Sequence, residues 1–313
     1  MSNKKGVKAL VLLIFLAIPL YSNAQVWSAL GNSVDDGVYS ICDDGHSIYV
    51  SKGYSPIRNF IEVWNGTTWD SIGLDCGNSP RDLVFFDGKL FSTNCENGLE
   101  YYDGTSWTSF TPRTNPSHIQ VIDSILYAFG GFDSIGTIAA GSIATWDGNL
   151  WHPIDTTKWY ATITGITSFR NELIIGGNFW NYDGSIQSLA RWDGQRWHNL
   201  GLNGLNGYIN CVITYYDELY IGGRFNITGI AGNAIARWDG NQWRDVGGGL
   251  NTNYAIVEKF IIHNDKLIPL GIFDFAGNIP ASNMAAWDGN QWCALNSRFD
   301  NKILCAHVFN NQL

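Results

Sequence analysis

Charged residues are scarce in this chain of 313 residues, where they make up 15% of the sequence, and acidic residues outnumber basic ones. Beyond the first ten residues no segment gathers basic residues into a cluster, and the formal net charge is −9. A negatively charged surface repels phosphate backbones and anionic lipid headgroups. The composition therefore argues against nucleic acids and anionic membranes as partners.

Motifs that carry chemistry are also lacking. The six cysteines form no C-x-x-C pair, and their spacing with the six histidines matches no metal-ligand pattern. The chain contains neither a G-x-S-x-G nucleophile motif nor a D-x-[DN]-x-[DN]-G calcium loop. We therefore expect no cofactor and no metal, and a binding protein rather than an enzyme.

Long apolar runs are absent except near the N-terminus. A basic segment, residues 4–8, precedes an apolar run over 9–20, and a small-x-small sequence follows at 22–24. This order predicts a signal peptide over 1–24 and export to the periplasm, the cell surface or the medium. Residues 25–313 would then form the mature chain, with a net charge of −12 after loss of three lysines. An uncleaved membrane anchor is the alternative.

Glycine and tryptophan are abundant, with 35 and 14 residues, and many of them belong to one repeated hexapeptide. It begins with an aromatic residue, continues with Asp-Gly or Asn-Gly, and ends with Trp. Asp-Gly supplies the positive φ that a tight hairpin turn needs, and the two aromatic rings would then lie opposite each other on one sheet face. The six copies occupy residues 64–69, 102–107, 146–151, 192–197, 238–243 and 287–292.

The hexapeptide recurs with the period of a propeller blade. Successive copies lie 38 to 49 residues apart, the length of one four-stranded blade. The fifth repeat predicts strands over 208–216, 219–223, 234–238 and 243–247, with a loop over 224–233. We therefore predict an all-β protein, a β-propeller of four-stranded antiparallel blades with six complete blades from about Val38 to Leu295.

Both ends of the chain carry further pieces of the repeat. Residues 26–31 match a last strand without the strands before it, and residues 302–309 match a first strand. Together they predict a partial seventh blade, in a domain over 25–313 that is truncated at its C-terminus. A six-bladed ring with overhanging ends is the alternative.

The repeat resembles the kelch motif, in which a strand ending in Gly-Gly is followed by an aromatic residue with Asp and then by Trp. Gly222-Gly223 followed by Trp238-Asp239 and Trp243 illustrates the match. It is more similar to the Trp-Asp-Gly repeats of exported bacterial β-propellers, often assigned to the galactose-oxidase central-domain type. The resemblance covers residues 26–313 and implies the fold. It implies no activity, because the copper ligands of galactose oxidase have no counterpart in this sequence.

Two tryptophans, Trp159 and Trp180, stand outside the repeat. We place Trp159 in the loop that enters blade 4 and Trp180 in the loop between its second and third strands, which emerge on the same face. With Tyr160, Tyr182 and Asp183 they form a candidate ligand site, because exposed aromatic faces suit sugar rings or a protein partner. Packing of these rings over a loop is the alternative.

Carboxylates in equivalent loops, Asp133, Asp183 and Asp274, support a different prediction, a carbohydrate-active enzyme. A third prediction is a purely structural module of a larger cell-surface protein. For the cysteines, Cys76 and Cys95 are a candidate disulfide. Cys211 and Cys305 occupy equivalent positions in blades that do not adjoin, which predicts free thiols.

Overall fold

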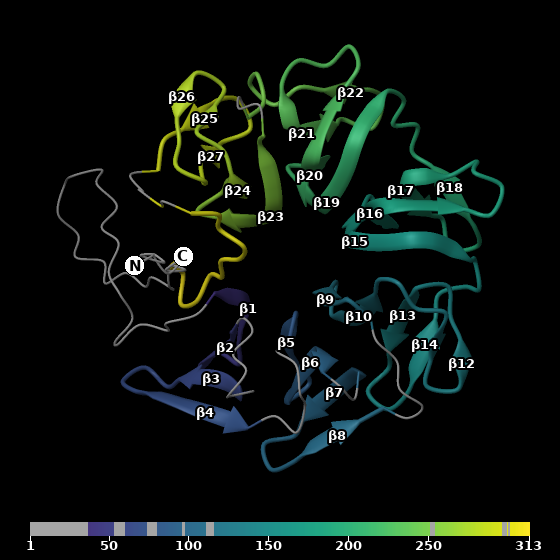
Figure 1. The fold of residues 1–313 in the computed structure, drawn as a ribbon, viewed down its shortest axis with the longest axis vertical. Helices are drawn as coiled ribbons and strands as arrows, with labels where there is room; N and C mark the ends of the chain where they lie inside the picture. The colour runs from purple at the N-terminus through teal and green to yellow at the C-terminus, as the bar shows by residue number, and fades with distance from the viewer. Residues whose placement is uncertain are drawn as a thin grey trace, which may run out of the picture.

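The repeated hairpins assemble into a ring of six blades. The computed structural model describes residues 37–52, 60–73, 80–95, 98–110, 116–250, 254–295, 299 and 301–313. Six four-stranded antiparallel sheets are arranged around a central channel, and within the described residues every regular element is a strand (Figure 1). The predicted all-β propeller with six complete blades is confirmed.

The strands of each blade follow one another in sequence, and the first lies nearest the channel (Figure 1). Blade 1 consists of β1 (Val38–Asp43), β2 (Ile48–Lys52), β3 (Phe60–Trp64) and β4 (Trp69–Gly73). Blade 2 consists of β5 (Leu83–Phe86), β6 (Lys89–Cys95), β7 (Gly98–Tyr102) and β8 (Trp107–Ser109). Blade 3 consists of β9 (His118–Ile122), β10 (Ile125–Phe129), β13 (Ile143–Trp146) and β14 (Trp151–Pro153), with a small hairpin of β11 (Ser134–Ile135) and β12 (Ile138–Ala139).

The second half of the ring follows the same order. Blade 4 consists of β15 (Trp159–Phe169), β16 (Glu172–Asn181), β17 (Gln187–Trp192) and β18 (Trp197–Asn199). Blade 5 consists of β19 (Leu205–Tyr215), β20 (Glu218–Ile227), β21 (Asn233–Trp238) and β22 (Trp243–Arg244). Blade 6 consists of β23 (Ile256–His263), β24 (Lys266–Ile272), β27 (Ala286–Trp287) and β28 (Trp292–Cys293), with a small hairpin of β25 (Phe275–Ala276) and β26 (Ile279–Pro280).

The hexapeptide forms the hairpin between the third and fourth strands of every blade. Its two aromatic residues pair across the strands, and their ring centroids lie 5.1 to 5.4 Å apart in all six copies. The glycine of each turn has a φ between 96° and 101°. A side chain with a Cβ would be strained there, which explains the glycine in every copy.

The Gly-Gly pair at the end of the second strand allows two close approaches. A Cβ on Gly222 would lie 2.7 Å from Val257 Cγ1 of the next blade, and a Cβ on Gly176 would lie 2.5 Å from the next blade's Val212. The second glycine faces its own blade, where a Cβ on Gly223 would lie 2.2 Å from the Tyr208 carbonyl oxygen. Neighbouring blades can therefore pack this closely because the first glycine of each pair has no side chain.

Aromatic side chains fill the spaces between the blades. Trp287 of blade 6 is buried and donates its indole N–H to the Tyr220 hydroxyl of blade 5, at 3.1 Å. Trp292 donates to the Val246 carbonyl, at 2.9 Å. These indoles bury a large apolar area and still satisfy their single donor. The repeated tryptophans of the hairpins are thus packing residues.

The first two strands of blades 4 and 5 run further than predicted. Both β15–β16 and β19–β20 continue past the Gly-Gly pair as two-stranded arms, with a bulge at the pair. Trp159 and Trp180, expected in loops, therefore lie in strands, and the loop predicted after Gly223 begins after Ile227. The bulge explains the error, because the chain resumes its pairing beyond the two glycines.

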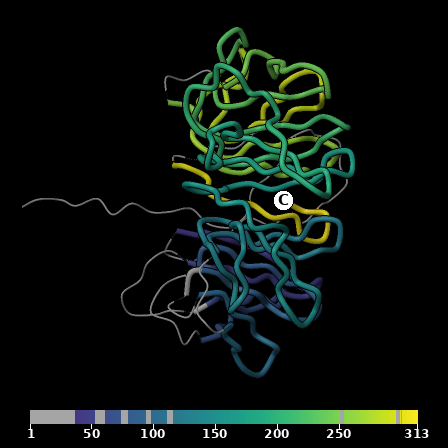
Figure 2. The backbone as a smooth tube through the Cα atoms, turned by 90° about the vertical axis from the view of Figure 1, so that its right-hand side faces the viewer, coloured from purple at the N-terminus to yellow at the C-terminus, as the bar shows by residue number. Residues whose placement is uncertain are grey.

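The C-terminal segment, residues 301–313, lies between blade 6 and blade 1 (Figures 1 and 2). It occupies the place of a seventh first strand, and Asn310 and Asn311 have the positive φ seen at the equivalent turns of other blades. Within the described residues this segment forms no ladder with a neighbouring strand. Its β-bridge, between Phe309 and Gln312, is internal to the segment. A strand needs a partner ladder to be assigned.

Several predictions fall outside the described residues: the signal peptide over 1–24, the strand over 26–31, and the Cys76–Cys95 disulfide, since nothing of residue 76 or of the Cys95 side chain is described. Cys211 and Cys305 are free thiols, as predicted. In the part of the chain that is described, no helix has the length and apolar character of a membrane span.

Candidate functional site

The predicted aromatic residues meet on the arm of blade 4. Tyr160 and Trp180 pair across β15 and β16, and their rings stack with a centroid distance of 6.1 Å and an angle of 13°. Trp180 is 45% exposed, and Tyr182, just past the end of β16, is 86% exposed. We call Tyr160, Trp180 and Tyr182 the blade 4 ledge.

Trp159 does not belong to this exposed surface. Its side chain is only 7% exposed, and its ring packs edge-on against Phe179 and Trp197, with centroid distances of 4.9 and 5.5 Å. Consecutive residues of a strand face opposite sides of the sheet. Tyr160 therefore faces solvent on the arm while Trp159 is buried beneath it.

Asp183 forms the turn beside the ledge. Its carboxylate accepts hydrogen bonds from the Ser185 hydroxyl, at 2.6 Å, and from the Ser185 backbone N–H, at 2.9 Å. These bonds hold the pKa of Asp183 below its usual range. The carboxylate is therefore ionised at neutral pH and shapes the turn that carries Tyr182.

A groove lies between blades 3 and 4, lined by Trp159 and Ala161 on the face of the arm opposite to Tyr160. Its cavity measures about 500 Å³, and Asp133 and Lys158 contribute charged side chains to its lining. The Lys158 ammonium also lies 5.9 Å from the centre of the Tyr160 ring. Lys158 therefore links the blade 3–4 groove to the ledge.

Asp133 and Asp274 occupy equivalent places, as expected from their spacing. Each begins a small hairpin and accepts a backbone hydrogen bond from an alanine N–H, Ala140 at 2.9 Å and Ala281 at 2.7 Å. Among the described residues, no group of three or more His, Cys, Asp or Glu is arranged to hold a metal ion.

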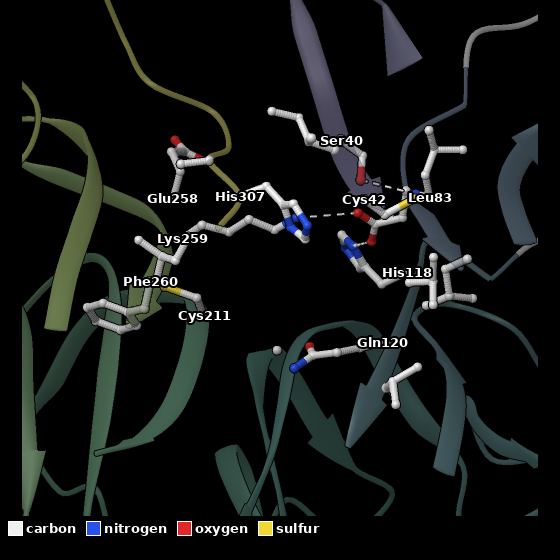
Figure 3. A pocket seen from close by; sticks show the side chains of 18 of the residues that line it. Ser40, Cys42, Leu83, His118, Gln120, Cys211, Glu258, Lys259, Phe260 and His307 are labelled. Carbon is white, nitrogen blue, oxygen red and sulfur yellow. Dashed lines mark hydrogen bonds and ion pairs between the residues drawn. The ribbon is translucent and has the colours of Figure 1, made fainter. Parts of the chain in front are cut away.

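A second polar site lies in the central channel, and sequence patterns alone did not point to it. The cavity measures about 640 Å³ and is lined by the first strand of all six blades and by residues 306–307 (Figure 3). Lys259 enters from blade 6 and His118 from blade 3, on different sides of the opening (Figure 3).

Asp82 of blade 2 connects these two side chains. Its carboxylate accepts a hydrogen bond at Oδ2 from His118 Nδ1, at 2.9 Å, and contacts Lys259 Nζ through Oδ1, at 3.4 Å. Burial raises the pKa of Asp82, but the charge of Lys259 and the hydrogen bond of His118 lower it further, so the net shift is downward. The carboxylate in turn raises the pKa of Lys259. Asp82 and Lys259 are therefore both charged at neutral pH.

The three residues are equivalent positions of the repeat. In each blade, one residue of the second strand pairs with the first aromatic residue of the hairpin. The residue three positions further along the second strand pairs with the first-strand residue compared here. In blade 1, for example, Trp64 pairs with Ile48, and Ser51 pairs with Ser40. This alignment, taken from the strand registers and from the backbone bonds of Thr93, places six residues at one level of the channel: Ser40, Asp82, His118, Gly165, Cys211 and Lys259. Polar residues at this one first-strand position of the aligned repeats are the sequence signal that would have found the cluster.

Two further polar contacts join the C-terminal segment to the channel, one of them a lysine–glutamate ion pair. His307 Nε2 lies 2.5 Å from Asp43 Oδ2 of blade 1, and Lys302 Nζ lies 2.6 Å from Glu258 Oε1 of blade 6. The buried thiol of Cys305 contacts the Val38 carbonyl oxygen, at 3.6 Å. Burial raises the pKa of Cys305 to about 11, so this thiol is protonated and a poor nucleophile at neutral pH.

Comparison with known proteins confirms the class defined by the ring of blades, the β-propeller. The extracellular domain described as that of a hybrid two-component system from B. thetaiotaomicron superimposes with a TM-score of 0.55 at 11% identity, covering 91% of this chain and 35% of that chain. YCF48 bound to a D1 peptide superimposes with a TM-score of 0.50 at 15% identity, covering 78% and 79%.

A third structure, YjhT, has a TM-score of 0.49 at 12% identity, covering 82% of this chain and 96% of that chain. No protein-family model matches the sequence, and no curated protein matches it. At these identities the similarity concerns the fold alone.

Proposed function

We propose that this chain is an exported binding protein that holds a glycan on the blade 4 ledge. The observation that carries the proposal is the exposure of the ledge, where Trp180 and Tyr182 offer aromatic rings to solvent. Exposed apolar side chains that are grouped into one patch, unlike scattered single ones, mark ligand or partner sites. The signal peptide predicted over 1–24 supports export, and the Trp-Asp-Gly repeat supports a place among exported kelch-like propellers.

The chemistry of the ledge favours a sugar. Sugar rings have an apolar face of C–H groups that packs against an indole, and hydroxyl groups that need donors and acceptors at the edge. The Lys158 ammonium, 5.9 Å from the centre of the Tyr160 ring, supplies donors, and the Asp183 carboxylate in the turn next to Tyr182 supplies acceptors. The turn at Asp183 is held by its own hydrogen bonds, so Tyr182 is presented at a defined place.

The test is glycan-array binding of the full chain, followed by titration of the best glycan. Trp180→Ala should weaken binding at least tenfold, since loss of one covered aromatic ring costs about 1.5 kcal/mol or more and 1.4 kcal/mol is a factor of ten. Tyr182→Ala should also weaken binding. Tyr254→Ala is the matched control, because Tyr254 is an exposed aromatic residue of blade 6, 71% exposed and away from the ledge.

Equal affinity of the wild-type chain and Trp180→Ala for every bound glycan would exclude the ledge as the site. Absence of any glycan binding, together with capture of a surface protein that depends on Trp180, would favour a protein ligand. Hydrolysis of a bound glycan that stops in Asp133→Asn would instead support the carbohydrate-active enzyme. Absence of all three activities would leave a structural module of a larger surface protein.

A further inference from the structure

We propose that the arm of blade 5 binds a sugar acid, with the Arg224 guanidinium donating hydrogen bonds to the carboxylate of the ligand. The site is a groove of about 370 Å³ beside β19, β20 and β21, which we call the blade 5 groove. It belongs to a different blade from the ledge and does not depend on it. Five polar side chains of blade 5 line it: Asn206, Tyr208, Arg224, Asn226 and Asn233.

The strand register brings these side chains to one face of the arm. Tyr208 pairs with Arg224 across β19 and β20. Two residues further along β20, Asn226 pairs with Asn206 on one side and with Asn233 on the other. Residues two apart in a strand, and residues paired across strands, share a face of the sheet. The arm thus presents an arginine, a tyrosine and a row of three amides to the groove.

Packing of the arm does not account for these residues. In blades 4 and 5 the second residue after the Gly-Gly pair is a buried phenylalanine, Phe179 in one arm and Phe225 in the other. The outward-facing positions differ, because Trp180 of blade 4 corresponds to Asn226 of blade 5 in the register. The fold therefore constrains the inner face of each arm and leaves the outer face available for a ligand.

The Arg224 guanidinium keeps its donors available. Arg224 is exposed, and within the described residues its side chain has neither an ion pair nor a hydrogen bond. Other arginines of the chain form ion pairs with carboxylates, namely Arg170, Arg191, Arg237 and Arg244. A guanidinium has five N–H donors, stays charged, and binds a carboxylate through two parallel hydrogen bonds.

The lining of the groove selects the class of ligand. Among the described residues that line it, Arg224 has the only charged side chain, so an anion meets no carboxylate there. One guanidinium balances one negative charge, which favours a carboxylate over a doubly charged phosphate. Each amide has a donor and an acceptor, as sugar hydroxyl groups require, and the exposed Tyr208 ring offers a face to sugar C–H groups. Because neighbouring strands lie about 4.8 Å apart, the three amides extend over about 10 Å, enough to follow the hydroxyl groups of one sugar ring.

Arginine-specific NMR on the full chain tests the proposal. The Nε–H signal of Arg224 is assigned by its absence in Arg224→Lys. Titration with sodium glucuronate at constant ionic strength should shift this signal in a saturable way, while the Arg196 signal stays unchanged. Arg196 is the matched control because its side chain is 77% exposed and lies in the hairpin turn of blade 4.

Affinity measurements provide the second test. Arg224→Gln should weaken glucuronate binding at least tenfold, Asn226→Ala should weaken it several-fold, and Arg196→Gln should leave it unchanged. Glucose, which lacks the carboxylate, and acetate, which lacks the hydroxyl groups, should each bind the wild-type chain at least tenfold more weakly than glucuronate. The circular dichroism spectrum shows whether each variant is folded, and the wild-type NMR titration stands if one is not.

An unshifted Arg224 signal, or equal glucuronate affinity of the wild-type chain and Arg224→Gln, would overturn the proposal. Acetate binding as tightly as glucuronate would also overturn it, since the groove would then recognise a charge and not a sugar. Tighter binding of N-acetyl-alanyl-alanine would assign the groove to a peptide carboxyl terminus instead. A chain that binds no glycan on its ledge can still bind glucuronate here, so failure at one site is distinguishable from failure at the other.

Discussion

Aspartates in the hairpin turns hold their negative charge at unusually low pH. The backbone N–H of Leu150 and the His152 ring lower the pKa of Asp147 to about 2. The Arg244 side chain and backbone N–H groups lower the pKa of Asp239 to about 2 as well. The residue that follows the second tryptophan, His152 in blade 3 and Arg244 in blade 5, thus stabilises the charged form of the turn aspartate.

These turns predict an acid-dependent loss of stability. The pKa of each carboxylate is lower in the folded chain than in the unfolded chain, where aspartate titrates near 3.9. The stabilisation is therefore complete above about pH 4 and is lost as the pH falls towards about 2. We expect the urea midpoint of the wild-type chain to decline over this window.

The double variant Asp147→Asn, Asp239→Asn separates the charge from the turn. Asn65 forms the same turn bonds in blade 1, so the variant should keep the hairpins. We expect a lower urea midpoint than wild type at pH 7 and a difference that vanishes near pH 2. A constant difference between the two chains at all pH values would show that the charge has no part in the effect.

The second strand of each blade is constrained by its neighbour. In β20 the first glycine of the pair, Gly222, lies against Val257 and Phe260 of β23. Because protein interiors are close-packed, an added methyl group has to displace one of these side chains.

Gly222→Ala should therefore destabilise the chain by about 1–3 kcal/mol, the usual cost of overpacking. The measurement is the free energy of unfolding from urea titration. Gly73→Ala is the matched control, since no atom of the described residues lies within 4 Å of a Cβ at that position in β4. A loss as large in Gly73→Ala as in Gly222→Ala would attribute the effect to strand glycines in general and contradict the packing argument.

At the scale of the whole molecule, the C-terminal segment closes the ring between blades 6 and 1. Asn283 joins the segment to blade 6: its amide donates to the carbonyl oxygens of Phe299 and Asn301, both at 2.9 Å. Its side-chain oxygen accepts the backbone N–H of Phe273, at 3.1 Å. One buried side chain thus satisfies three backbone groups.

Asn283→Ala should remove these three hydrogen bonds and lower the free energy of unfolding by about 1–3 kcal/mol. Hydrogen exchange should accelerate first at the Ile303 amide, which donates to the Gly271 carbonyl oxygen. Asn290→Ala, at an exposed turn position, serves as the control. Unchanged exchange at Ile303 in Asn283→Ala would show that the segment is held by its other contacts.

Much of this molecule was predictable from local patterns. The hexapeptide specifies its hairpin because Asp-Gly and paired tryptophans act over six residues, and its period specifies the number of complete blades. The same reasoning failed at the arm of blade 4, because a bulge at Gly176-Gly177 allows pairing to resume further along the chain. Whether Trp159 or Tyr160 faces solvent depended on that pairing.

The sequence by itself determined the hairpins, the blades and the ring, since each follows from short-range turn chemistry repeated at a fixed period. Only the tertiary structure decided which aromatic residues are exposed and which polar residues share the channel. Asp82, His118 and Lys259 belong to three different blades, and no local pattern relates them. They meet because the closed ring turns one position of every first strand towards the same axis.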